Sequence, residues 1–213
     1  MPFDTRYALT DSARRTESFW LYASAPIESV LTTSNLTANG SVYTIDSTNT
    51  TATFTIDEVL RGSPKTVVGT TDQVAGQFAF NSSDPSSSQL GTITIDARTL
   101  ATDDDTRNRA LGNQILSTSD YEYITFTPTA LSGLPSSIAA GQPFTFQATG
   151  DLTIKGITNP ATFDINVTPS DDGALTGTAT STINYADWGV SIPSVPFVAS
   201  VEHVVTLGLT FAA

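Results

Sequence analysis

The side chains that most often carry catalysis are scarce in this sequence. It has no cysteine, so thiolate catalysis and cysteine-ligated metals are excluded, and its one imidazole belongs to His203. A single histidine is enough for a Ser-His-Asp triad, but no Gly-x-Ser-x-Gly elbow is present to expose a nucleophile. His203 shares the parity of the apolar residues in the last alternating run, which predicts a histidine that is buried or lines the mouth of the fold. We therefore expect no catalytic residue and no enzyme.

A cluster of aspartates is the best candidate for binding a metal ion. Asp103, Asp104 and Asp105 offer hard oxygen ligands for Ca²⁺, but they lack the alternate spacing of an EF-hand loop and no Glu follows at its twelfth position. Apolar residues recur at helical spacing after them, and aspartates before a helix accept its free amide hydrogens. The sequence predicts a short helix at about 105–116, a hairpin turn at residues 171–173, and no metal site.

The charge of the chain excludes several classes of partner. There are 9 Lys and Arg against 21 Asp and Glu, so the net charge is -12, and residues 110–213 hold one basic residue, Lys155. Nucleic acids and anionic membrane surfaces attract clustered positive charge, so we expect neither as a partner. Ser and Thr supply 59 of the 213 residues, which favours strands whose exposed faces carry hydroxyls. No run of 18 apolar residues is present to span a membrane.

From residue 41 onward, apolar and polar residues alternate in about eight runs separated by turn-forming residues. In one run Ala52, Phe54 and Ile56 alternate with threonines. Each run has one apolar and one polar face, as antiparallel strands around a single interior require. The pattern predicts an all-β domain at residues 41–213, either a barrel or a sandwich. Residues 1–40 lack sustained alternation and are interpreted as an N-terminal extension.

The apolar faces of these runs supply the candidate ligand-binding residues. The pattern leaves open whether their side chains fill the interior or surround a hollow. Trp188 either lines the mouth of the interior or packs in the core beside a glycine bend. The candidates are Phe54, Ile56, Phe78, Phe80, Ile93, Ile95, Phe126, Phe144, Phe146, Ile154, Phe163, Ile165 and Trp188.

Five groups of residues, in the expected order, resemble the YceI-like family. They are YTID at 43–46 with ATFTI at 52–56, GTITID at 91–96, RNRAL at 107–111 with YEYITF at 121–126, GDLTIKGITNP at 150–160, and YADWGV at 185–190. The resemblance implies a lipocalin-like antiparallel β-barrel of about eight strands, with one inserted helix, that binds polyisoprenoids or other long apolar molecules. Where that family often has histidine, this chain has Asn49 and Ala110, so any polar role of those histidines is lost or reassigned.

Two hypotheses from different classes follow. In the first, the chain is a non-enzymatic, extracytoplasmic protein (periplasmic, on the cell surface or secreted) that holds a polyisoprenoid, quinone or fatty-acid-like molecule and no other cofactor. In the second, it is a structural subunit of an extracellular assembly or filament, in which residues 1–40 add a strand to another copy of the chain. Residues 14–25 resemble a signal peptide only weakly, because their apolar core has five residues. In an archaeon or eukaryote, the Asn-x-Ser/Thr sequons would mark an exported surface; they begin at Asn35, Asn39, Asn49, Asn81 and Asn166.

Overall fold

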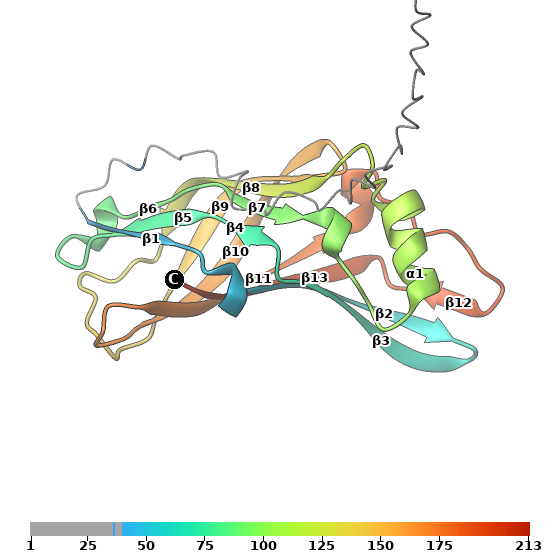
Figure 1. Ribbon diagram of the computed structural model, residues 1–213, viewed down its shortest axis with the longest axis horizontal. Helices are drawn as coiled ribbons and strands as arrows, with labels where there is room; N and C mark the ends of the chain where they lie inside the picture. The colour runs from blue at the N-terminus through green and yellow to red at the C-terminus, as the bar shows by residue number, and fades with distance from the viewer. Residues whose placement is uncertain (1–35, 37–39) are drawn as a thin grey trace, which may run out of the picture.

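Figure 1 shows the computed structural model of the protein, which describes residue 36 and residues 40–213. This part of the chain forms thirteen strands, a short α-helix and several helical turns. The predicted N-terminal extension at residues 1–40 lies almost entirely outside the described residues. Its boundary and its predicted role in self-association therefore stay predictions.

The strands fall into a long and a short group. The long strands are β2 (Thr51–Leu60), β3 (Ser63–Thr71), β8 (Tyr123–Ser132), β9 (Phe144–Ile154), β10 (Ile157–Pro169), β11 (Leu175–Asn184) and β13 (Val204–Ala212). The short strands are β1 (Ser41–Thr44), β4 (Val74–Ala75), β5 (Gln77–Phe80), β6 (Gln89–Leu90), β7 (Ile93–Asp96) and β12 (Val198–Val201). The 3₁₀ turns are η2 (Ser47–Asn49), η3 (Pro85–Ser87), η4 (Ala97–Thr99) and η6 (Tyr185–Trp188).

The long strands form one antiparallel sheet that curls back toward its own edge. Its order is β3-β2-β13-β11-β10-β9-β8-β7-β4, and β12 pairs with β2 on the same side as β13. At the β3 edge, Thr70 exchanges backbone hydrogen bonds of 2.9 and 3.0 Å with Ala101, which follows η4 and β7, so this edge is tied to the other side of the sheet. A small sheet, β1-β5-β6, lies at one end, where the backbone N–H of Asp46 donates to the carbonyl of Ala212. The fold is a nearly closed antiparallel barrel with one short helix, which confirms the predicted fold class and decides against a sandwich.

The high threonine content has a structural reason on the outer face of the barrel. On β9, Ala148 is fully buried while its neighbour Thr149 is exposed. The hydroxyl of Thr149 lies 3.0 Å from that of Thr162 on β10, and the hydroxyls of Thr153 and Thr158 lie 2.8 Å apart. Such hydroxyl pairs stabilise neighbouring strands without charged side chains. Threonine is also β-branched, which suits the extended backbone.

The predicted helix forms where expected, but its second half is wider than an α-helix. Helix α1 (Asp105–Ala110) begins after Asp104, whose carboxylate accepts a hydrogen bond from the backbone N–H three residues on, at 2.8 Å. The π-helical turn η5 (Leu111–Ile115) follows, and the N–H of Leu116 donates to the carbonyl of Leu111. Both leucines are buried. In an α-helix, residues five apart point to different faces, so the wider turn allows both to enter the core.

Three tight turns connect consecutive long strands. The β2–β3 turn places Arg61 and Gly62 at φ of 51° and 83°, and the β9–β10 turn places Lys155 and Gly156 at 51° and 74°. Two consecutive positive φ values match the type I′ turn that suits the twist of a hairpin. Residues 171–173 form the turn between β10 and β11, as predicted.

The last predicted strand is interrupted, and this displaces His203. Strands β12 and β13 both pair with the same side of β2, through Val201 with Glu58 and Thr206 with Thr55. Four residues separate Val201 from Thr206 while two separate their partners, so the strand bulges there. His203 lies in this bulge and is exposed, with its ring 6.4 Å from that of Tyr185. Of the two alternatives predicted for His203, burial or a place at the mouth of the fold, burial was wrong, because the bulge breaks the alternation on which it depended.

Candidate ligand-binding cavity

The barrel is hollow at one end only. At the end that carries α1, the interior contains a cavity of about 710 Å³, which we call the large cavity. At the end covered by the small sheet, the interior contains about 70 Å³, which we call the small cavity. Neighbouring inward residues of one strand line both: Leu207 of β13 lines the large cavity and Leu209 the small one. The two cavities are therefore successive sections of one interior.

Aliphatic side chains make up most of the wall of the large cavity. Of the predicted site residues, Phe54, Ile56 and Ile154 line it. The ring of Phe54 lies over Gly69 of β3, where an added Cβ would come within 2.1 Å of the ring. Outside residues 189–197, the other aliphatic lining residues come from β2, β3, the residue after η4, α1, η5 and the strands opposite: Ala52, Leu60, Val67, Leu100, Ala110, Leu111, Ile115, Leu116, Ile124, Ile183, Val198, Val201, Val205 and Leu207.

Most of the other predicted site residues fill the opposite end of the barrel. The residues that line the small cavity include Phe78, Phe80, Ile93, Phe126, Phe146, Phe163 and Ile165. Their rings contact each other edge to face: the centroids of Phe126 and Phe163 lie 4.7 Å apart, and those of Phe80 and Phe146 lie 6.0 Å apart. Phe144 and Ile95 pack against this core and line neither cavity. Aromatic rings thus occupy most of this half of the interior.

Trp188 lies in the core and not at the mouth of the large cavity. Its side chain is 3% exposed, and its indole Nε1–H donates to the carbonyl oxygen of Leu152 at 2.8 Å. Gly189 follows it with a φ of 62° and ends the η6 turn. An added Cβ at Gly189 would lie 2.7 Å from the side chain of Ile157, so the close approach also favours glycine. The second of the two sequence interpretations, a core tryptophan beside a glycine bend, describes this residue.

The segment between η6 and β12, residues 189–197, forms a wall of the large cavity that the strand pattern did not predict. Its apolar side chains point to the cavity from an irregular backbone. The backbone N–H of Arg61 donates to the carbonyl of Phe197 at 2.7 Å and ties this wall segment to the β2–β3 turn. An apolar residue at roughly every second position was its signal in the sequence. The lining residues are Val190, Ile192, Pro193, Val195 and Phe197.

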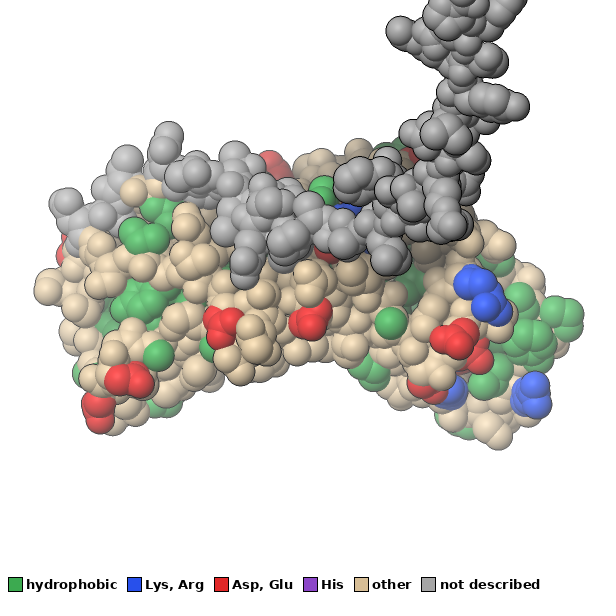
Figure 2. Space-filling model, in the orientation of Figure 1, with side chains coloured by type: hydrophobic (Ala, Val, Ile, Leu, Met, Phe, Trp, Pro, Cys, Tyr) green, Lys and Arg blue, Asp and Glu red, His purple; other side chains and the backbone are tan. Residues whose placement is uncertain are grey.

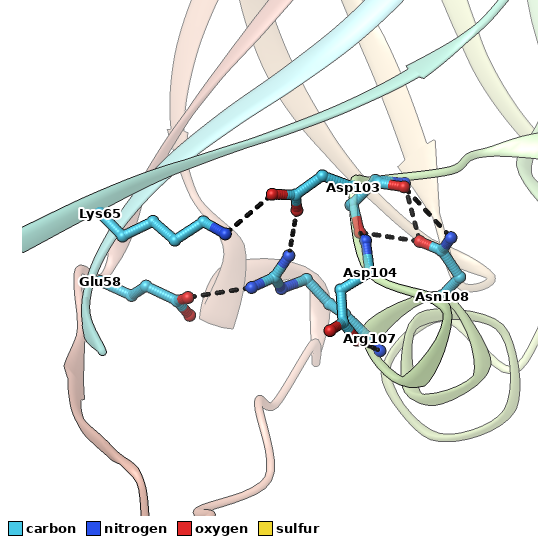
Figure 3. Close-up of polar contacts among 7 residues, drawn as sticks. Glu58, Lys65, Asp103, Asp104, Arg107 and Asn108 are labelled. Carbon is cyan, nitrogen blue, oxygen red and sulfur yellow. Dashed lines mark hydrogen bonds and ion pairs between the residues drawn. The ribbon is translucent and has the colours of Figure 1, made fainter. Parts of the chain in front are cut away.

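Charged side chains gather at the mouth of the large cavity (Figure 3). Glu58 and Lys65 are cross-strand partners on the inward faces of β2 and β3. Arg107 reaches them from α1, with Nη2 3.1 Å from Glu58 Oε1 and Nη1 2.6 Å from Asp103 Oδ1. Lys65 Nζ lies 2.8 Å from Asp103 Oδ2. Hydrogen bonds from Lys65 and then Arg107 hold the pKa of Asp103 below its ordinary value.

Basic side chains are concentrated at the mouth of this acidic chain, where Glu58 and Asp103 form ion pairs with Lys65 and Arg107. Arg61, Lys65 and Arg107 line the large cavity, against two carboxylates, those of Glu58 and Asp104. The net charge of the whole chain is -12, yet three of the six basic residues in the described part lie at this one opening. In the view of Figure 2, the Lys and Arg side chains are concentrated at this end, next to a group of hydrophobic side chains. The site combines an apolar hollow with a polar and partly basic opening.

The site shows no grouping suited to metal catalysis. Among residues 36 and 40–213, no three His, Asp or Glu side chains lie close enough together to hold a metal ion. No helix in this part of the chain has the length and hydropathy needed to cross a bilayer. The chemistry that the arrangement supports is the enclosure of an apolar chain with one polar end outside.

Comparison with solved structures finds the same fold. The crystal structure of BcnA from Burkholderia cenocepacia is 17% identical, covers 79% of this chain and 99% of its own, and superposes with a TM-score of 0.63. A polyisoprenoid-binding domain from Saccharophagus degradans, implicated in plant cell wall breakdown, is 14% identical, with coverages of 81% and 97% and a TM-score of 0.60. A YceI protein from Campylobacter jejuni is 18% identical, with coverages of 66% and 80% and a TM-score of 0.52.

A comparison with curated proteins found no match. The YceI-like domain, in contrast, matches residues 43–213, which include the second half of β1 and every later strand. This match covers far more than half of the chain, and the solved structures share its fold along the same region. The chain therefore belongs to the YceI-like family.

Proposed function

We propose that the protein is a non-enzymatic carrier that holds one long apolar molecule, with its tail in the large cavity and its polar end at the charged mouth. The observation that carries this proposal is a cavity of about 710 Å³, walled by aliphatic side chains and bordered by charges at its opening. Pockets that bind small molecules measure roughly 300–1,000 Å³. The polyisoprenoid binding described for the Saccharophagus degradans domain supports an isoprenoid, quinone or fatty-acid-like ligand.

The hydrophobic effect supplies enough driving force for such a ligand. Each buried methylene contributes about 0.8 kcal/mol, so a dozen contribute about 10 kcal/mol. Association costs about 4–15 kcal/mol in lost motion and ordering. Short chains are therefore held weakly, and a chain that fills the cavity is held firmly.

The charges at the mouth define which polar ends fit. Arg107 and Lys65 bring cationic groups to an opening whose lining carries three basic and two acidic side chains. A carboxylate, hydroxyl or quinone carbonyl accepts hydrogen bonds from these groups, whereas a cationic end meets like charge. We propose that the polar end of the ligand is neutral or anionic. We also propose an extracytoplasmic location, which the hydroxyl-rich, lysine-poor composition supports.

Organic extraction of the purified protein tests this proposal. We expect a long-chain apolar compound in near-stoichiometric amount, identified by mass spectrometry. The variant Ala110→Trp places an indole in the large cavity and should release much less of it. The control Ala130→Trp adds the same side chain on the exposed face of β8 and should match the unaltered protein. Clean extracts from several preparations of the unaltered protein, or equal yields from both variants, would count against the carrier function.

A further inference from the structure

The floor of the large cavity is a layer of aromatic side chains. On β8, Ile124 lines the large cavity, and the next inward residue, Phe126, lines the small one. On β10, Phe163 also lines the small cavity, and its ring contacts that of Phe126 edge to face at 4.7 Å. The change from hollow to filled interior therefore occurs at these two rings.

The sequence of the strand between them makes this contact possible. Phe126 and Phe163 come from β8 and β10, which flank β9. Phe163 of β10 is paired with Ala148 of β9, and the next inward residue of β9 is Gly150. Ala148 carries only a methyl group, which leaves space beside it for the ring of Phe163 to reach that of Phe126. At Gly150 the backbone of β8, at Thr127 and Pro128, occupies the place of a side chain. Large side chains beside small ones fill such an interior without voids.

Beyond this layer there is no room for a ligand chain. The rings of Phe78, Phe80 and Phe146 follow one another with centroid distances of 5.4 and 6.0 Å, and they leave only the small cavity of about 70 Å³. One water molecule takes up about 30 Å³ of the liquid, and a methylene needs a similar volume. The small cavity thus has space for only two or three carbon atoms.

The same arithmetic gives the capacity of the large cavity. Its 710 Å³ corresponds to roughly 20 to 25 chain carbons. A longer chain has no path past the floor, so its remaining carbons stay at the mouth, in contact with water. Carbons in water contribute no burial, and affinity stops increasing with length once the hollow is full.

We propose that Phe126 and Phe163 form a floor that limits the buried part of the ligand tail to about 20–25 carbons, so that isoprenoid or fatty tails longer than this gain no further affinity. This inference rests on the proposed carrier function and adds its substrate range. It makes Phe126 and Phe163 the residues that set the length of tail that the barrel buries.

Titration of the delipidated full chain with isoprenoid alcohols of about 10 to about 45 carbons tests the proposal. Below the limit, affinity should rise by about fourfold for each methylene buried. Above about 25 carbons it should stay constant. Affinity that keeps rising to the longest alcohol overturns the floor but leaves the carrier function intact. No binding at any length overturns the carrier function itself.

Variants of the floor give the second part of the test. Phe163→Ala, or the milder Phe163→Leu, joins the two cavities and should move the limit to longer chains by several carbons. Leu207→Phe adds volume above the floor without leaving a void and should move the limit to shorter chains. Phe144→Ala is the matched control, because its ring packs in the same aromatic cluster but lines neither cavity. A limit that stays the same in both Phe163→Leu and Leu207→Phe, or shifts equally in Phe144→Ala, contradicts the proposal.

Discussion

The ion pair between Arg107 and Glu58 gives the sharpest prediction about the mouth of the cavity. The Glu58 side chain is 9% exposed and that of Arg107 22% exposed, with Nη2 and Oε1 3.1 Å apart. The variant Arg107→Met keeps most of the apolar stem and removes the guanidinium, which leaves an inward carboxylate without this partner. Removing one member of a fully buried pair costs about 3–5 kcal/mol. Exposed pairs contribute only about 0–1 kcal/mol.

The expected cost lies between these limits. Lys65 is the cross-strand partner of Glu58 and is able to turn toward it, which reduces the loss. We expect Arg107→Met to lower the free energy of unfolding by about 1–2 kcal/mol. In a domain of this size that corresponds to a decrease of roughly 3–6 °C in Tm. Urea and thermal unfolding of the delipidated protein measure both quantities.

A double-mutant cycle isolates the pair from other effects of the substitution. The variant Glu58→Gln removes the charge that Arg107→Met leaves unpaired. The double variant should therefore lose about 1 kcal/mol less unfolding free energy than the two single variants lose in sum. The same cycle on Lys65 and Asp103, which are 32% and 62% exposed, is the control and should give a smaller, salt-sensitive coupling. A coupling near zero for Glu58 and Arg107 would refute the reasoning.

Four further predictions concern the rest of the molecule. Gly69→Ala pushes the ring of Phe54 into the large cavity, so titration should show weaker ligand binding while the unfolding midpoint changes little. Trp188→Phe removes the indole N–H that donates to a backbone carbonyl of β9, so unfolding should become easier by about 2–3 kcal/mol with unchanged ligand binding. The pKa of Asp103 is lowered in the folded state, so its stabilisation is complete above the unfolded pKa near 4 and is lost as pH falls through the folded value; Asp103→Asn should show a smaller loss of stability on acidification. A chain lacking residues 1–40 should fail to form any assemblies that the full chain forms if those residues join subunits, and light scattering that gives the same size for both would contradict that role.

The fold was predictable because strand alternation and turn residues are local signals. Ala52, Phe54 and Ile56 alternate with threonines, and the structure places them on the inner face of β2. The same parity continues to Glu58, so the alternation also indicates an inward carboxylate at this position. The bulge at His203 had no such signal, because it depends on how two strands share one side of β2.

The alternation of apolar and polar residues does not predict which part of the interior is hollow. Phe54 and Phe126 have the same residue type and the same inward parity, yet one lines the large cavity and the other the aromatic end. The difference comes from partners distant in sequence: Phe126 meets the ring of Phe163, whereas the ring of Phe54 lies over Gly69. Parity specifies the face of a strand, but the filling of the interior depends on three-dimensional neighbours.

The central claim is that an apolar tail enters the barrel from the α1 end and stops at the aromatic floor. A crystal structure with a bound alkyl carboxylate of about 18 carbons that carries bromine on its last carbon tests it directly. We predict an anomalous bromine peak inside the barrel between Leu207 and Phe126, with the carboxylate near Lys65 and Arg107. A bromine peak at the mouth, on the outer face of the barrel or beyond Phe126 would contradict it.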